Sequence, residues 1–236
     1  MTTHSKKFSP SSAHRWINCP GSVRLLEKIT HRIIRSEDHA EEGTKAHELS
    51  ETLIAANDHE TYSDHEFYEN VLEYVESVKA NDNYVIERKV SFNKTFGIKG
   101  GFGTPDCVVF HEFGDLEVKD FKYGFVSVSS IDNEQLMLYA LGAIGTYKLN
   151  PANIKLSIYQ PRIKNYSSHT ITRDELGDFK EKALKSIIKI ENDSDELIVG
   201  EKQCRYCDVR HLCPALFNKT QELISENRKM LEVLSL

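Results

Sequence analysis

Two carboxylates and a lysine lie close together near the middle of the chain. Asp106 directly precedes the apolar run 107–110, and the triplet Asp120-Phe121-Lys122 follows fourteen residues after Asp106. On two paired strands, these side chains would meet at one edge of a sheet. Two carboxylates can hold Mg²⁺ or Mn²⁺, which polarises a phosphate and acidifies a water, while the amine orients that water or neutralises developing charge. Hard oxygen ligands favour these two ions over zinc.

A second acid-x-lysine triplet, Glu117-Val118-Lys119, overlaps the first. Side chains alternate along a strand, so the two triplets belong to opposite faces. The two sets are Leu116, Val118, Asp120 and Lys122 on one face, and Glu117, Lys119 and Phe121 on the other. We assign the site to the first set, because its aliphatic residues lead directly into the acid and the lysine, as in a strand that emerges from the core.

The five cysteines form an odd set. The first residues lack the apolar core of a signal peptide, so we expect metal ligands or buried thiols and not a disulfide framework. Four thiolates, Cys19, Cys204, Cys207 and Cys213, suit tetrahedral zinc or a [4Fe-4S] cluster equally in number, and unligated thiols are a third possibility. A zinc ribbon normally offers two Cys-x-x-Cys knuckles, and this chain has one. Cys107 lies within an apolar run and is predicted to be a core thiol.

Composition excludes several classes of protein. The 236 residues have a net charge of -6, which argues against a protein that coats nucleic acid, although an enzyme can add positive charge through bound metals. The mean hydropathy is -0.46, and no window approaches the roughly eighteen apolar residues of a spanning helix. We therefore expect a soluble cytoplasmic protein with no membrane partner.

Hydrophobic periodicity predicts an α/β fold with a central sheet flanked by helices. One predicted helix is entered through Gly43-Thr44. A second has apolar residues at helical spacing from Phe67, after a capping box of Ser63 and Glu66, and a third covers 133–147. The expected strands are 84–92, 106–110 and 116–123 as a meander, and then 154–160. A helix opened by Thr172 with Glu175, a polar linker at 191–203 and a helix over 214–236 complete the pattern.

Four short motifs occur in a characteristic order. They are Gly43-Thr44-x-x-His47, Gly103-Thr-Pro-Asp106, Asp120-Phe-Lys122-Tyr-Gly and Gln135-x-x-x-Tyr139. Together, over about residues 9 to 215, the chain resembles the PD-(D/E)XK nuclease superfamily, specifically its RecB-like exonuclease branch with phage-encoded and CRISPR-associated members. This resemblance implies one domain over 1–236 with a restriction-endonuclease-like core and a central mixed β-sheet.

The resemblance also implies roles for individual residues. His47, Asp106, Asp120 and the main-chain carbonyl of Phe121 would bind the metal, and both acids and Lys122 would be catalytic. Gln135 and Tyr139 would contact substrate. This chain has Asp120 where many relatives have Glu, which shortens the reach of the carboxylate and leaves the chemistry available.

The cysteine arrangement resembles the iron-sulfur staple of RecB-like exonucleases, because one cysteine near the N-terminus joins three near the C-terminus. Cys19 and Cys213 are both followed by proline. The resemblance implies a [4Fe-4S] cluster on Cys19, Cys204, Cys207 and Cys213, which would join the N-terminal segment to residues 204–213 before the helix over 214–236. Zinc on the same four thiolates is the alternative.

The expected function is a metal-dependent DNA exonuclease that processes ends in recombination or repair, in a bacterial or phage-infected host. Its expected partners are DNA, single-stranded or with accessible ends, and a single-strand annealing or binding protein. Scattered basic residues would line a strand channel: Arg15, Arg24, Lys94, Lys99, Arg162, Lys164 and Arg205. The alternatives are a non-catalytic nucleic-acid-binding scaffold with a four-cysteine metal site, or a structure-specific endonuclease that uses the same active site.

Overall fold

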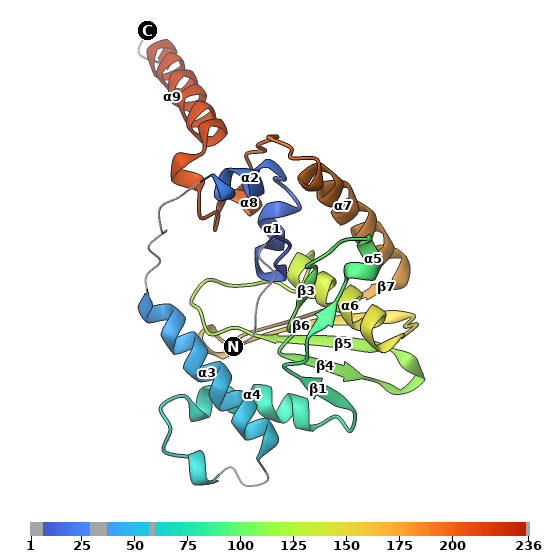
Figure 1. Ribbon diagram of the computed structural model, residues 1–236. Coiled ribbons are helices and arrows are strands. Elements are labelled where there is room, and N and C mark those ends of the chain that lie inside the picture. Colours follow the sequence, from blue (N-terminus) through green and yellow to red (C-terminus); the bar gives the residue numbers. More distant parts are fainter. Residues whose placement is uncertain (1–6, 29–36, 57–59, 235–236) are drawn as a thin grey trace. The chain divides into compact units, whose positions relative to one another are not determined.

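The computed structural model describes residues 7–28, 37–56 and 60–234, and the chain divides into two compact units (Figure 1). Unit 1 comprises residues 1–11 and 34–180, and unit 2 comprises 12–33 and 181–236. The span that we predicted as one domain thus comprises these two units. In the part of the chain that is described, no helix is both long and apolar enough to cross a membrane.

Unit 1 is built on a five-stranded mixed sheet. Its strands, in spatial order, are β1 (Tyr84–Ile86), β4 (Cys107–Phe110), β5 (Leu116–Phe121), β6 (Asn153–Gln160) and β7 (Asn165–Thr172). All neighbours are antiparallel except β5 and β6, which are parallel and therefore need a crossover. The helix α6 (Glu134–Tyr147) provides it. The prediction of a central mixed sheet flanked by helices is confirmed.

Helices cover both faces of this sheet. On one face, α3 (Glu37–Ala55) and α4 (Tyr68–Lys79) share a core with the inward residues Cys107, Val109 and Phe121 (Figure 1). Cys107 is fully buried, as predicted, and burial raises the pKa of its thiol to about 12. The helix α6 lies on the other face. It begins after Asn133, whose side chain accepts a hydrogen bond from the Leu136 amide at 3.1 Å.

The prediction of one continuous strand over 84–92 is wrong, because the structure has two short strands there. β1 ends at Ile86, and Glu87 has a φ of +48°, a left-handed conformation that breaks the strand. The remainder forms β2 (Val90–Ser91), which pairs with β3 (Phe102–Gly103) in a separate two-stranded sheet around α5 (Asn93–Phe96). Alternation thus identified strand character but could not reveal a change of sheet.

Three further predictions of local structure need correction. The helix α3 begins at Glu37, so Gly43 lies inside it and not at its entrance. Ser63 donates to the Glu60 carbonyl, and α4 begins only at Tyr68, so the expected capping box does not form. The strand β7 was not predicted, because it is an edge strand of mostly polar residues with only Ile171 buried.

The capping box of Thr172 and Glu175 is confirmed. Each amide donates to the other side chain, at 2.7 and 3.3 Å, at the start of α7 (Arg173–Glu191). Within the described ranges, the short 3-10 helices are η1 (Pro10–Ser12), η2 (Glu60–Tyr62), η3 (Glu112–Gly114), η4 (Pro161–Ile163) and η5 (Arg210–Leu212).

Unit 2 joins the two ends of the chain. It contains α1 (Ala13–Trp16), α2 (Gly21–Glu27), the end of α7, α8 (Glu201–Cys204) and α9 (Pro214–Leu234). The Gly21 amide donates to the Glu196 carbonyl at 3.0 Å, and a Cβ on Gly21 would lie 2.7 Å from that backbone, so only glycine permits this approach. The predicted C-terminal helix is present as α9, and residues 235–236 lie outside the described residues.

Candidate active site

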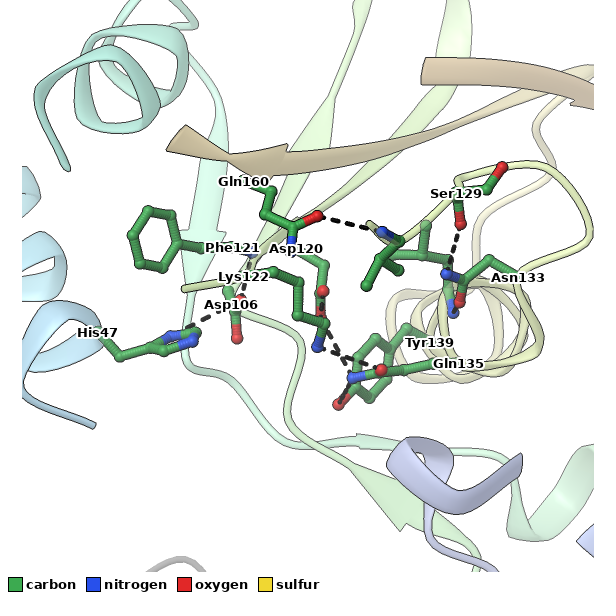
Figure 2. Close-up of polar contacts among 12 residues, drawn as sticks. His47, Asp106, Asp120, Phe121, Lys122, Ser129, Asn133, Gln135, Tyr139 and Gln160 are labelled. Carbon is green, nitrogen blue, oxygen red and sulfur yellow. Dashed lines mark hydrogen bonds and ion pairs between the residues drawn. The ribbon is translucent and has the colours of Figure 1, made fainter. Parts of the chain in front are cut away.

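Asp106 lies at the end of the sheet, immediately before β4. Its Oδ2 atom accepts a hydrogen bond from the Phe121 amide at 2.6 Å and lies 3.8 Å from Nδ1 of His47 (Figure 2). The His47 ring, which comes from α3, stands edge-on to the Phe121 ring with centroids 5.1 Å apart. The fold therefore brings a helix and two strands together at this carboxylate.

Asp120, Lys122 and two residues of α6 form the neighbouring part of the site. Lys122 Nζ lies 2.8 Å from Asp120 Oδ2 and 3.3 Å from Gln135 Oε1 (Figure 2). Gln135 Nε2 lies 3.2 Å from both Asp120 Oδ1 and Tyr139 Oη. A Cβ on Gly103 would lie 2.6 Å from the Tyr139 ring, so the glycine of the Gly103-Thr-Pro-Asp106 motif permits this close packing. All the predicted site residues of unit 1 thus lie together, and their roles stay predictions.

Glu87 is a site residue that sequence reasoning missed. Ligand atoms of His47, Glu87 and Asp106 all lie within 4.8 Å of one another, and this is the one such trio of acids, histidines or cysteines among the described residues. The Glu87 amide donates to the Asp106 carbonyl at 3.2 Å, which fixes the two residues side by side. The available signal was an acid directly after an apolar strand that neighbours the Asp106 strand.

The site holds an excess of buried negative charge. Burial, followed by the charge of Asp106, raises the pKa of Glu87 to about 8. Burial likewise raises the pKa of Asp106 to about 6, although His47 opposes the shift. Burial alone would lower the pKa of Lys122, but Asp120 and Asp106 outweigh it and raise that pKa. Acids that resist ionisation beside each other are the arrangement that a divalent cation relieves.

The donor set fits a hard divalent ion. Asp120 Oδ2 is buried and, among the described residues, has no hydrogen-bond partner of good geometry although Lys122 Nζ is close. Carboxylate oxygens and one imidazole are ligands for magnesium or manganese, and an unsatisfied buried oxygen is a position that a cation would fill. The Phe121 amide is already occupied by Asp106, and its carbonyl is the ligand that the family resemblance implies.

The second acid-x-lysine triplet lies elsewhere, on the face covered by α4. Glu117 is buried and accepts a hydrogen bond from Ser157 Oγ at 2.6 Å, while Lys119 Nζ donates to the Ser77 carbonyl of α4 at 2.6 Å. The two triplets therefore point to opposite faces, as the alternation predicts.

Residues 4–235 match the family described as Protein of unknown function (DUF2800). The chain belongs to this family. Among solved structures, the one entitled "Crystal structure of SSO0001" is similar over 91% of this chain and 89% of that one, with 15% sequence identity and a TM-score of 0.41.

The four predicted cluster cysteines of this DUF2800 protein all belong to unit 2. Burial raises the pKa of Cys19, and the negative charges of Cys213 and Cys204 add to the shift. Burial also raises the pKa of Cys207, where Cys19 and Cys204 contribute in the same direction. Among the described residues, no three of these sulfurs lie within 4.8 Å of one another, so the cluster stays a prediction. Arg15, expected in a strand channel, is instead buried and donates to Ser22 Oγ at 3.0 Å.

Proposed function

We propose that this DUF2800 protein is a metal-dependent DNA nuclease of the RecB-like PD-(D/E)XK type, acting as an exonuclease on DNA ends. The observation that carries the proposal is the trio of His47, Glu87 and Asp106, with ligand atoms within 4.8 Å, next to the ion pair of Asp120 and Lys122. Acids, an imidazole and an amine converge at one end of a mixed sheet, which is the arrangement that metal-assisted phosphodiester hydrolysis needs.

In this proposal, His47, Asp106 and Asp120 hold Mg²⁺ or Mn²⁺, with the carbonyl of Phe121 as a further ligand. Glu87 adds a carboxylate from β1's end, beside Asp106. The bound ion would polarise the scissile phosphate and acidify a water. The Phe121 amide orients Asp106 by a 2.6 Å hydrogen bond, so the carboxylate does not need to reorganise when the ion arrives.

Lys122 supplies positive charge at a fixed place. Its ammonium lies between Asp120 and the Gln135 side chain, and it keeps its proton because the neighbouring acids raise its pKa. From there it would orient the attacking water or neutralise the charge that develops on the phosphate. Gln135 also donates to Asp120 and to Tyr139, so it fixes the positions of the Asp120 carboxylate and the Lys122 ammonium. We assign Gln135 and Tyr139 to substrate positioning.

The four cysteines of unit 2 would hold a [4Fe-4S] cluster with a structural role. One cysteine near the N-terminus and three near the C-terminus, all in unit 2, are the arrangement that the resemblance associates with such a cluster. Iron and acid-labile sulfide in anaerobically purified protein are the expected result. Stoichiometric zinc without sulfide would instead support the alternative metal.

The cellular role follows from the resemblance alone. A RecB-like exonuclease in a bacterial or phage setting would process DNA ends for recombination or repair, alongside a single-strand annealing or binding protein. This part of the proposal predicts activity on single strands or on duplexes with accessible ends.

Cleavage of matched linear and circular DNA in Mn²⁺ tests the proposal. An exonuclease degrades the linear molecule and leaves the closed circle intact, whereas an endonuclease nicks both. A scaffold protein binds without cleaving either. The Asp106→Asn variant is the control, because it keeps the shape of the side chain but removes a charge from the proposed metal site. Cleavage that persists unchanged in this variant would contradict the proposal.

A further inference from the structure

The loop between β5 and α6 exposes three large apolar side chains beside the site. Phe125 is 60% exposed, Val126 is 46% exposed and Ile131 is 58% exposed. Single exposed apolar residues are common on proteins, but three within seven residues of one loop need an explanation. Lys122 is the first residue of this loop and Asn133, the cap of α6, is its last, so the loop connects the two elements that supply Asp120 and Gln135 to the proposed active site.

Hydrogen bonds from the sheet hold this loop in one conformation. The fully buried Gln160 of β6 donates to the carbonyls of Gly124 and Val126, and its Oε1 accepts from the Val128 amide (Figure 2). The Asn165 side chain donates to the Val128 carbonyl at 2.8 Å. Further along, Ser167 Oγ bonds both the amide and the hydroxyl of Ser130. The apolar side chains are therefore presented on a fixed support.

Arg162 gives the exposed ring a cationic neighbour. Its guanidinium carbon lies 4.1 Å from the centroid of the Phe125 ring and 4.7 Å from that of Tyr123. The same guanidinium donates to the Tyr123 carbonyl and pairs with Glu42 of α3. Arg162 is thus locked in place, and it orients Phe125 while most of the ring stays exposed.

We propose that Phe125, supported by Arg162, is a stacking platform for an unpaired base of the DNA strand that is cut. This inference rests on the proposed nuclease function and specifies its substrate. Phe125 is three residues from Lys122, so their Cα atoms are at most about 10 Å apart, which is the span of a few nucleotides of a single strand. A base inside a duplex already stacks on its neighbours, so only an unpaired base can use the ring.

The position of the platform sets a preference for strand type. A phosphate at Lys122 and a base on Phe125 require a single strand, or a duplex whose end has opened by a few pairs. The guanidinium would add positive charge near the backbone of that strand. A surface for another protein would not need to lie beside the phosphate chemistry, and this proximity favours DNA as the occupant.

Fluorescence of a single-stranded oligonucleotide that carries 2-aminopurine tests the proposal, because stacking quenches this base. The full-length protein is titrated in Ca²⁺, which we expect to support binding without turnover. Phe125→Ala should bind about fivefold to a hundredfold more weakly and lose the quenching, whereas Phe125→Trp should keep both. Tyr166→Ala is the matched control, since it removes an aromatic of 45% exposure from β7 and should bind as the wild type does.

A second single-stranded oligonucleotide distinguishes base stacking on Phe125 from other effects of the Phe125→Ala substitution. When an abasic nucleotide replaces the quenched base, wild-type protein and Phe125→Ala should bind equally, because the ring has lost its partner. Equal binding of the intact strand by both proteins would overturn the platform. A loss that persists on the abasic strand would also overturn it and would indicate a protein surface or a folding role. Wild-type protein that neither binds the strand nor cleaves DNA in Mn²⁺ overturns the nuclease function itself.

Discussion

The two acid-x-lysine triplets of β5 lie on the same strand but in different chemical environments. Both oxygens of Glu117 have partners: Ser157 and Lys155 at Oε1, His111 and Lys119 at Oε2. Asp120 Oδ2 is buried and has an ion pair with Lys122 at 2.8 Å, but among the described residues it has no hydrogen-bond partner of good geometry, whereas both Glu117 oxygens have one. The side chain of Lys119 is 5% exposed, whereas that of Lys122 is 29% exposed.

This difference separates a structural ion network from a site. A buried charge is tolerated when neighbours satisfy every polar atom, as around Glu117, whose pKa is lowered overall although burial alone would raise it. The Asp120 side keeps incomplete contacts and acids whose pKa values are raised. A buried polar atom without a hydrogen-bond partner lowers stability unless a ligand binds it. We therefore expect the Asp120 triplet to bind metal and substrate.

The largest expected effect is the loss of cleavage when the Asp120 triplet is altered. Asp120→Asn and Lys122→Ala should each reduce cleavage by at least roughly a hundredfold. The first removes a negative charge that would hold the metal, and the second removes the ammonium that would face the reacting phosphate. Because Lys122→Ala removes the cation beside a buried carboxylate, urea denaturation of both variants is the control that separates a loss of chemistry from a loss of folding. Activity that survives in these variants but disappears in Glu117→Ala and Lys119→Ala would reverse our assignment of the faces.

The second expected effect is on stability and concerns the other triplet. Glu117→Ala should lower the free energy of unfolding by about 3 to 5 kcal/mol, because Lys119 would be left buried without its compensating acid. The folded fraction should still cleave DNA. Urea denaturation measures the loss, and Lys155→Ala, which removes a half-exposed partner of Glu117, should cost no more than about 1 kcal/mol. Equal costs for the two variants would mean that the network is not tightly satisfied.

Sequence reasoning found the β5 triplets because alternation and charge spacing are local properties. It also found α6, where Asn133 marks the helix start and the spacing of Gln135 and Tyr139 places both on one face. It missed Glu87 although an apolar strand precedes this acid, because we predicted one strand over 84–92 and did not foresee the left-handed backbone at Glu87, directly after β1 ends. Similarly, β7 lacks a buried apolar face, and pairing with β6 defines it.

A smaller effect is expected when the neutral ligand is removed. His47→Ala should weaken cleavage at limiting metal, because water can replace one imidazole, whereas Asp106→Ala removes charge that holds the ion and abolishes activity. Excess Mn²⁺ should partly rescue the His47 variant only. Cleavage is measured against Mn²⁺ concentration for both variants. A His47 variant that matches the wild type at every concentration would make this histidine a packing residue against Phe121.

A further expected effect is a pH dependence of stability that distinguishes Glu87 from Glu117. The pKa of Glu87 rises from 4.5 in the unfolded chain to about 8 in the fold, so its contribution is complete below pH 4.5 and is lost as the pH rises to about 8. Glu117 has a lowered pKa, so its contribution is lost only as the pH falls below 4.5. Metal-free protein should therefore have a lower melting temperature at pH 8 than at pH 5, and Glu87→Gln should flatten this slope whereas Glu117→Gln should not. Mn²⁺ should raise the melting temperature more at pH 8, where protons no longer compete for the carboxylates. An unchanged slope in Glu87→Gln would show that this acid titrates normally and stands outside the charged site.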